Sequence, residues 1–265
     1  MIRTNYFAKT DSRFIVDQKG PFSVMEYAKD LSVSPHTAPG AYFAAAMGVR
    51  KKQVICTLNN SGVILQAGAM QVMSGNITAA TDIKGAGDLL KKFVGSRVTG
   101  ETTIKPKYTG TGLVVLEPTY KYIILEDLAN WGGAVVVEDG VFLACQDTVG
   151  MKVVARSTIS SAIAGGEGLF NTCLQGQGVV CLESTVPYSE LFVVDLENDT
   201  LKIDGNMAIA WSPQLQFTVE RTTKTLIGSA ASGEGLVNVY RGTGRVLIAP
   251  VAFNPGIATP VTSGV

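Results

Sequence analysis

Short apolar stretches separated by glycine-rich segments run along most of the chain, and one pattern of alternation occurs three times. The stretches are "AGAMQVM" at 67–73, "DGVFLAC" at 139–145 and "DGNMAIA" at 204–210. In each, large apolar residues occupy every second position after a glycine. A period of two is typical of a strand with one face on a core. We therefore expect a half-buried strand at each of these places.

A second pattern is apolar on both faces and also occurs three times. It reads "TGTGLVVLEP" at 109–118, "QGQGVVCLES" at 175–184 and "RGTGRVLIAP" at 241–250, so that its first glycines, Gly110, Gly176 and Gly242, are 66 residues apart. Apart from Arg245, the run after Gly-x-Gly predicts a central strand covered on both sides. Because glycine readily adopts positive φ, the Gly-x-Gly itself predicts a turn.

Together these copies predict an all-β chain of three homologous β-sandwich-like repeats. A further strand, "TYKYIILEDL" at 119–128 and "PYSELFVVDL" at 187–196, follows the first two copies only. Three joined units can close around a pseudo-threefold axis, which hides edge strands. The expected organisation is an N-terminal accessory segment (1–55), repeats at 56–128, 129–196 and 197–251, and an irregular tail (252–265).

The accessory segment contains its own local patterns. "SRFIVDQ" and "FSVMEYA" alternate and predict two strands, and "TAPGAYFAAAMGV" predicts a short helix with Pro39 in its first turn. We expect the segment to pack on the first repeat.

Charge and composition narrow the possible functions. The chain has 265 residues, of which 46% are hydrophobic, with 22 basic and 22 acidic side chains. The absence of a basic excess argues against a dedicated nucleic-acid binder. No apolar run reaches the roughly 18 residues that cross a bilayer, and the first residues lack a signal-peptide pattern. The expectation is a cytoplasmic protein, with peripheral membrane association as an option.

Side chains for catalysis or metal binding are scarce. His36, the single histidine, lies in a proline-rich loop and is interpreted as a surface residue. Cys145 and Cys181 occupy positions that are apolar in the other copies, which predicts buried, reduced thiols. The four cysteines lack zinc spacing, and the glycine-rich stretches lack the phosphate-loop and dinucleotide fingerprints. No catalytic, cofactor or metal site is predicted, although an enzyme remains a third possibility.

Three glutamates recur at equivalent places, namely Glu101, Glu167 and Glu234. Each carboxylate could fix its own loop by accepting backbone hydrogen bonds, or the three could form an acidic ring around a cation. The first interpretation is favoured, because structural networks are the commoner reason for placed charges.

Apolar residues precede these glutamates in every copy and form a candidate interaction face: Leu89, Leu90, Phe93, Ile159, Ile163, Leu226 and Ile227. Three such loops on one side of the molecule could meet a partner or an anionic lipid surface. Alternatively, these side chains cover the three small cores.

Several motifs resemble the "altered inheritance of mitochondria" family, formerly a domain of unknown function. They are "QAGAMQVMSG" (66–75), "GGEGLF" (165–170), "IDGNMAIAW" (203–211) and "SGEGLVNVYRGTGRVLIAP" (232–250). The resemblance implies a fold like the subunit of the tryptophan RNA-binding attenuation protein, repeated within one chain. It supplies no catalytic residues, and it links mitochondrial members to inner-membrane organisation.

The resulting functional hypothesis is a non-enzymatic structural or interaction protein that self-associates, with a trimer among the options. It would act at a membrane surface or as an assembly scaffold, through a lipid or protein partner. The alternative is a small-ligand or RNA-binding module, by analogy with the attenuation-protein fold.

Overall fold

The computed structural model describes residues 3–81, 105–155, 170–221 and 236–251. Its regular structure is almost entirely β, which confirms the all-β prediction. The bounds of the first eight strands are β1 Arg13–Lys19, β2 Phe22–Tyr27, β3 Lys52–Leu65, β4 Met70–Ala80, β5 Lys107–Leu116, β6 Tyr122–Asp127, β7 Ala134–Val137 and β8 Phe142–Gln146. The others are β9 Val149–Ala155, β10 Phe170–Gly176, β11 Val179–Ser184, β12 Phe192–Asp204, β13 Ala208–Trp211, β14 Gln216–Arg221 and β15 Leu236–Ile248.

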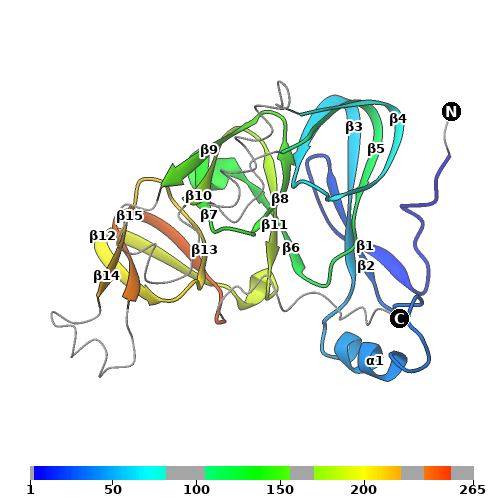
Figure 1. Ribbon diagram of the computed structural model, residues 1–265, viewed down its shortest axis with the longest axis horizontal. Helices are drawn as coiled ribbons and strands as arrows, with labels where there is room; N and C mark the ends of the chain where they lie inside the picture. Colours follow the sequence, from blue (N-terminus) through cyan, green and yellow to red (C-terminus); the bar gives the residue numbers. More distant parts are fainter. Residues whose placement is uncertain (1–2, 82–104, 156–169, 222–235, 252–265) are drawn as a thin grey trace, which may run out of the picture.

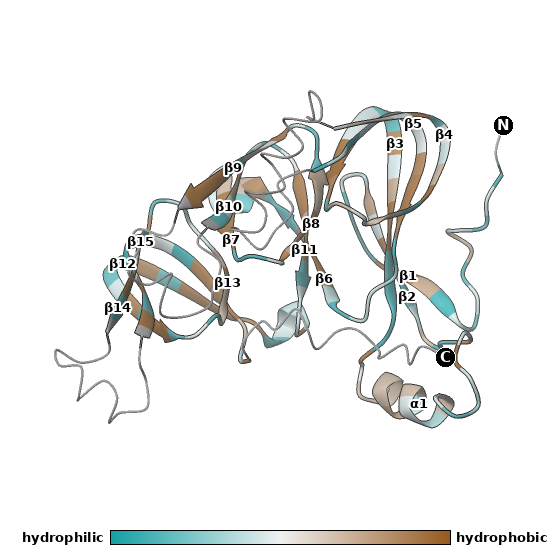
Figure 2. Cartoon of the chain, in the orientation of Figure 1, coloured by the Kyte–Doolittle hydropathy of each residue, from teal (hydrophilic) through white to brown (hydrophobic). Residues whose placement is uncertain are grey.

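The strands form two curled sheets (Figure 1). The eight-stranded sheet has the order β1-β2-β3-β8-β11-β6, and β5 pairs with both β3 and β4. The seven-stranded sheet has the order β12-β15-β13-β7-β10-β9, with β14 paired to β15. The most hydrophobic segments lie on strands in the middle of the molecule (Figure 2), where one buried cluster, which includes Phe142, Leu174 and Leu247, joins residues of both sheets.

Three strand groups share one pairing scheme. In group 1 (β3, β4, β5), β5 lies between β3 and β4. In group 3 (β12 to β15), β15 lies between β12 and the successive β13 and β14. In group 2 (β6 to β11) each of the three corresponding strands is divided into two shorter ones. As a result, β11 lies between β6 and β8, and β10 lies between β7 and β9. The strands that carry the second pattern are therefore central, as predicted.

The repeats, their boundaries and their pseudo-threefold arrangement stay predictions. The strand at 122–127 was placed at the end of the first repeat, yet β6 pairs with β11 of the second. Likewise, β12 begins at Phe192, before the predicted boundary at 197, and pairs with β15 along its whole length. Boundaries just before β6 and β12 keep β6 with β11 and β12 with β15, and among the described strands only the β3–β8 and β7–β13 pairings then join different groups. With these boundaries the further strand begins groups 2 and 3 instead of ending repeats 1 and 2. Its counterpart at the start of group 1 is β3, so no copy follows the third Gly-x-Gly.

The turn predicted at Gly-x-Gly is wrong for groups 1 and 3, where β5 and β15 run straight through the motif. In group 1 the glycines allow close approach of another backbone instead. A Cβ on Gly110 would lie 2.0 Å from the Asn76 carbonyl oxygen, and one on Gly112 would lie 2.0 Å from that of Ser74. Their φ values are +140° and +152°. Glycine inside a strand typically marks such a contact or a sharp bend.

The N-terminal segment forms the predicted elements and packs on group 1. The β1–β2 hairpin extends the eight-stranded sheet, because β2 pairs with β3 from Phe22↔Cys56 to Glu26↔Lys52. The helix α1, Ala38–Ala46, follows with a proline in its first turn. It lies apart from both sheets, at the lower right of Figure 1.

Candidate functional site

The predicted acidic positions and the predicted interaction face lie outside the described residues. This applies to Glu101, Glu167 and Glu234, and equally to Leu89, Leu90, Phe93, Ile159, Ile163, Leu226 and Ile227. Both hypotheses therefore stay predictions.

The structure does place the cysteines and the histidine. Cys145 and Cys181 are fully buried, as predicted. Burial raises the pKa of the Cys145 thiol to about 12 and that of Cys181 well above its usual range, so neither is a reactive thiolate at neutral pH. His36 is exposed in a turn before α1. No group of three metal-ligating side chains occurs within the described ranges.

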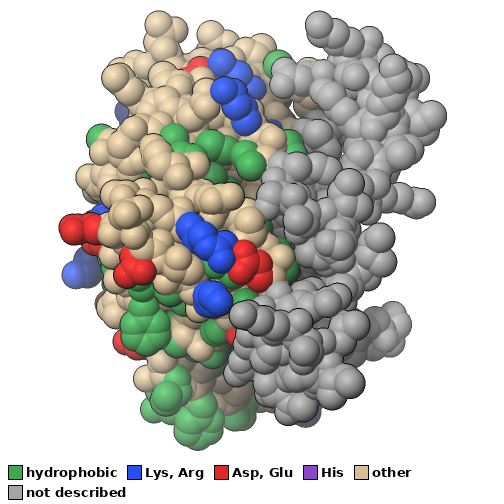
Figure 3. Space-filling model, turned by 90° about the vertical axis from the view of Figure 1, so that its left-hand side faces the viewer, with side chains coloured by type: hydrophobic (Ala, Val, Ile, Leu, Met, Phe, Trp, Pro, Cys, Tyr) green, Lys and Arg blue, Asp and Glu red, His purple; other side chains and the backbone are tan. Residues whose placement is uncertain are grey.

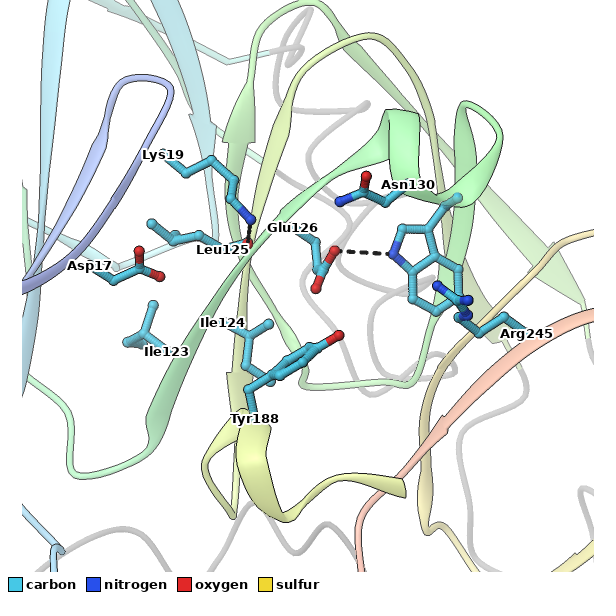
Figure 4. A pocket seen from close by; sticks show the side chains of 10 residues that line it. Asp17, Lys19, Ile123, Ile124, Leu125, Glu126, Asn130, Tyr188 and Arg245 are labelled. Atoms are coloured by element: carbon cyan, nitrogen blue, oxygen red, sulfur yellow. Dashed lines mark hydrogen bonds between the residues drawn. The ribbon is translucent and has the colours of Figure 1, made fainter. Parts of the chain in front are cut away.

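A cleft of about 540 Å³ opens where the two sheets meet (Figure 4). Its wall combines β1, β6, β15 and two short 3-10 helices, η1 (Leu128–Trp131) and η2 (Tyr188–Glu190). The polar and aromatic side chains that line it are Asp17, Lys19, Glu126, Asn130, Trp131, Tyr188 and Arg245, beside the aliphatic residues 123–125.

Local sequence explains how Glu126 and Trp131 come together. After β6 the Asp127 carboxylate accepts a hydrogen bond from the Ala129 amide at 2.9 Å and caps η1. The turn ends at Gly132, whose φ of +66° is the left-handed conformation that glycine adopts freely. This compact turn brings Trp131 back toward Glu126, and the indole Nε1 donates to the Glu126 carboxylate at 3.4 Å.

The two basic side chains of the cleft, Lys19 and Arg245, form hydrogen bonds with groups other than Glu126. Arg245 forms a two-bond ion pair with Asp195 at 2.7 and 3.1 Å, and this contact lowers the pKa of the Asp195 carboxyl. The Lys19 ammonium donates to the Leu125 carbonyl at 2.6 Å. Glu126, only 8% exposed, has no ion pair with any described residue. Burial and the nearby Glu126 charge raise the pKa of the Tyr188 hydroxyl.

A second unusual region is α1, whose side chains are all apolar and of which none is buried. Tyr42 is 71% exposed and Phe43 67%, and their ring centroids lie 5.5 Å apart, edge to face. Met47, just after the helix, is 81% exposed. Figure 3 keeps the vertical axis of Figure 1 and shows hydrophobic side chains at the lower end of the molecule.

The backbone at the end of α1 is nevertheless held in place. Arg50 Nε donates to the Ala45 carbonyl at 3.3 Å, and the Tyr122 hydroxyl donates to the Gly48 carbonyl at 3.2 Å. Arg50 also pairs with Glu26 at 2.9 Å. Beneath them Lys52 is buried, with its ammonium 4.2 Å from the Tyr122 ring centroid. The helix is thus anchored through its C-terminal backbone while its two aromatic side chains, Tyr42 and Phe43, are exposed.

No helix of the described residues is both long enough and apolar enough to cross a bilayer. At 1.5 Å per residue, α1 is about 14 Å long, against about 30 Å for the hydrocarbon core.

The cleft was not predicted from the sequence because its residues come from five separate elements. One feature of the sequence could have indicated the cleft. Arg245 interrupts an otherwise apolar run, and a charge in a central strand indicates a specific partner.

Comparison with known proteins shows how this chain is classified. Residues 46–251 match the family model described as Mitochondrial biogenesis AIM24. An uncharacterized protein of Streptococcus pyogenes serotype M6 is 30% identical over 198 residues, which cover 72% of this chain and 77% of that protein. A Streptococcus pyogenes crystal structure superposes with a TM-score of 0.58 at 25% identity and covers 77% of this chain and 89% of that one.

Proposed function

The chain belongs to the Mitochondrial biogenesis AIM24 family, and from this premise we propose that it is a non-enzymatic interaction protein that docks on a membrane surface through α1. The observation that carries the proposal is a regular helix that buries none of its side chains. A helix that is apolar all round normally lies inside a core. An anchored helix that exposes such side chains to solvent is typical of a docking element.

The chemistry of α1 favours a lipid surface as the partner. A tyrosine and a phenylalanine side by side form an aromatic group of the kind that settles at the boundary between headgroups and acyl chains. The surrounding segment 26–52 contains four basic and two acidic residues, a net charge of +2, which adds modest attraction to anionic lipid. The helix is too short to span the bilayer, so insertion would be shallow.

Vesicle sedimentation tests the proposal with a matched pair of substitutions. Phe43→Glu places a charge on α1, whereas Phe192→Glu places the same charge on β12, where Phe192 is similarly exposed at 60%. Vesicles of phosphatidylcholine with phosphatidylglycerol should sediment the unsubstituted protein and F192E, but not F43E. Equal binding by all three proteins, or no binding by any, would refute the proposal.

A second candidate function, self-assembly, is supported by the strand pairing between groups. Leu65 of β3 pairs with Ala144 of β8, and Val137 of β7 pairs with Ala210 of β13. Leu65, Val137 and Ile203 are equivalent positions in groups 1, 2 and 3, and so are Val72, Ala144 and Ala210. The corresponding contact from group 3 to group 1 would therefore join Ile203 of β12 to Val72 of β4. The corresponding partners of residues 72, 144 and 210 within their groups are residues 115, 181 and 247, again 66 apart.

These two positions do not meet within the described chain, where β12 pairs only with β15 and β4 only with β5. A second copy can supply the missing partner for each edge. Such a head-to-tail contact closes into a ring, such as a trimer, or extends as a filament. It would also cover edge strands that otherwise invite aggregation.

Cysteine cross-linking tests this assembly. The double substitution Val72→Cys with Ile203→Cys should give disulfide-linked oligomers under mild oxidation, and each single substitution should give none. Light scattering on the unsubstituted protein should show a mass above the monomer's 27.9 kDa. A monomeric mass together with no cross-linked ladder would exclude the assembly.

Charge on the visible surface does not favour the RNA-binding alternative. In Figure 3 lysine and arginine side chains lie among aspartate and glutamate rather than in one basic stripe. Phosphate recognition normally needs such a stripe.

A further inference from the structure

We propose that the cleft between the two sheets binds a small organic cation, an ammonium or guanidinium group, with Glu126 as its counter-ion. The cleft is lined by β6, η1, η2 and Arg245. This inference does not depend on the membrane or self-assembly proposals, because α1, β4 and β12 contribute no residue to the lining of the cleft.

The first argument is the unusual state of Glu126. Its side chain is more than nine-tenths buried and its one hydrogen bond is the long contact from the Trp131 indole. A buried carboxylate that lacks a cation is costly, and buried charges in folded proteins are normally paired or bound to a metal. Lys19 donates to a backbone carbonyl and Arg245 forms its ion pair with Asp195, so the Arg245 charge acts on Glu126 only from a longer distance. We therefore assign the direct ion-pair partner of Glu126 to a ligand.

The second argument is the aromatic surround of this carboxylate. In Figure 4 the Glu126 and Tyr188 side chains lie on the same side of the cleft, and the Trp131 indole donates a hydrogen bond to the Glu126 carboxylate. Trp131 is 6% exposed and Tyr188 is 50% exposed, so one ring lies at the floor of the cleft and the other at its mouth. Aromatic faces attract ammonium and guanidinium groups, and the attraction grows where water is excluded.

The donor set favours an organic cation over a metal ion. Calcium or magnesium requires about six oxygen ligands, whereas among the described lining residues only Glu126 places a carboxylate beside the buried Trp131. Asp17 lies on β1, across the cleft, and accepts a hydrogen bond from the Gln18 amide. The volume of about 540 Å³ is that of a site for a small molecule.

The rim also restricts which amines fit. Arg245 is neutralised by its two bonds to Asp195, so it does not offer a free cation to a ligand carboxylate. The expected ligand class is therefore an amine without a carboxylate, such as a diamine or a quaternary ammonium compound.

Calorimetric titration of the unsubstituted protein with cadaverine and with choline, at constant ionic strength, tests the inference. We expect saturable binding of at least one of them and a change in Trp131 fluorescence. Glu126→Gln should weaken binding at least about tenfold, because a charge-assisted contact is lost. Glu220→Gln is the matched control, since Glu220 pairs with Arg241 on β14 and β15, outside the cleft, and it should bind like the unsubstituted protein.

A stability measurement separates ligand binding from a structural role. If Glu126 exists to hold a ligand, E126Q should melt at a higher temperature than the unsubstituted protein when no amine is present. A purely structural Glu126 would give the opposite shift, and this would overturn the proposal. Absence of saturable binding at millimolar amine, unchanged binding by E126Q, or tighter binding of calcium chloride than of either amine would also overturn it.

Discussion

The Gly-x-Gly motif of group 1 and that of group 3 have nearly the same sequence but different surroundings. In group 1, a Cβ on Gly110, the first glycine of the motif, would lie 2.0 Å from a backbone oxygen of β4. In group 3, a Cβ on Gly242 would meet nothing closer than 3.9 Å. The strand opposite explains the difference, because β4 is continuous whereas the chain leaves the ladder between β13 and β14.

The comparison shows that the same motif occurs in three strand arrangements. The strands of group 1 stay paired through the motif and therefore come into close backbone contact. In group 3 the partner strand is interrupted, which relieves the backbone crowding at Gly242, whereas a Cβ on Gly244 would still lie 2.8 Å from the Ser212 side chain. In group 2 the central strand itself is interrupted, and the chain passes from the seven-stranded to the eight-stranded sheet between Gly176 and Val179. Glycine is thus required for different reasons at equivalent positions.

The largest expected effect is that of alanine at these glycines. Gly110→Ala should destabilise the protein by about 4 kcal/mol or more, because a rigid backbone must move and alanine must also adopt an unfavourable φ of +140°. A Cβ at Gly242 makes only ordinary van der Waals contacts, so Gly242→Ala should cost only about 1–3 kcal/mol from its φ of +118°. Urea unfolding of both variants measures the difference. Equal losses would show that conformation rather than backbone contact decides the requirement at both places.

Cysteine labelling compares the two sheets at a smaller scale. Cys56 and Cys181 lie in the eight-stranded sheet and are fully buried, whereas Cys173 of β10 is 7% exposed. Burial raises the pKa of all three thiols, and nearby Lys152 opposes this only for Cys173.

In native buffer a thiol reagent should therefore modify Cys173 at least about tenfold faster, which corresponds to a difference of 1.4 kcal/mol in the opening free energy. Mass spectrometry of peptides at successive times measures the order of labelling. If Cys56 or Cys181 reacted first, the eight-stranded sheet would be the less stable of the two.

Strand periodicity and the 66-residue step were sufficient to predict the all-β class and the central strands, and local patterns predicted the two N-terminal strands and the helix, but not that these strands pair as a hairpin. These features depend on local alternation and on glycine and proline chemistry, which a sequence displays directly. The turn at Gly-x-Gly was wrong because positive φ also occurs inside a strand where another backbone approaches. The residues around Gly110 do not indicate that the backbone of Asn76, 34 residues earlier in the chain, will lie against it.

The cleft could not be predicted for a related reason. The Glu126 carboxylate looks like an ordinary strand-end charge in "YIILED", and only folding shows that it is buried without a cation. Tyr188 and Arg245 reach it from elements more than sixty residues further along the chain. Likewise, the sequence predicts the helix α1 but not that its side chains remain exposed.

The smallest expected effect concerns a cross-strand ion pair of group 3. Glu220 on β14 forms two bonds with Arg241 on β15, at 2.6 and 2.8 Å. The Arg241 guanidinium and the Thr218 hydroxyl lower the pKa of the Glu220 carboxyl to about 2. Because the folded value lies below the ordinary 4.5, the stabilisation is fully present above about pH 4.5 and is lost as pH falls toward 2.

The two side chains are 35% and 36% exposed, so solvent screens the pair and its contribution to stability should be small. Thermal melts of the unsubstituted protein and Glu220→Gln should therefore differ slightly at pH 7 and converge near pH 2. Added salt should reduce the difference at pH 7, since exposed charges are screened. A difference that persists unchanged at pH 2 would mean that packing of the Glu220 side chain, rather than its charge, stabilises the outer strands of group 3.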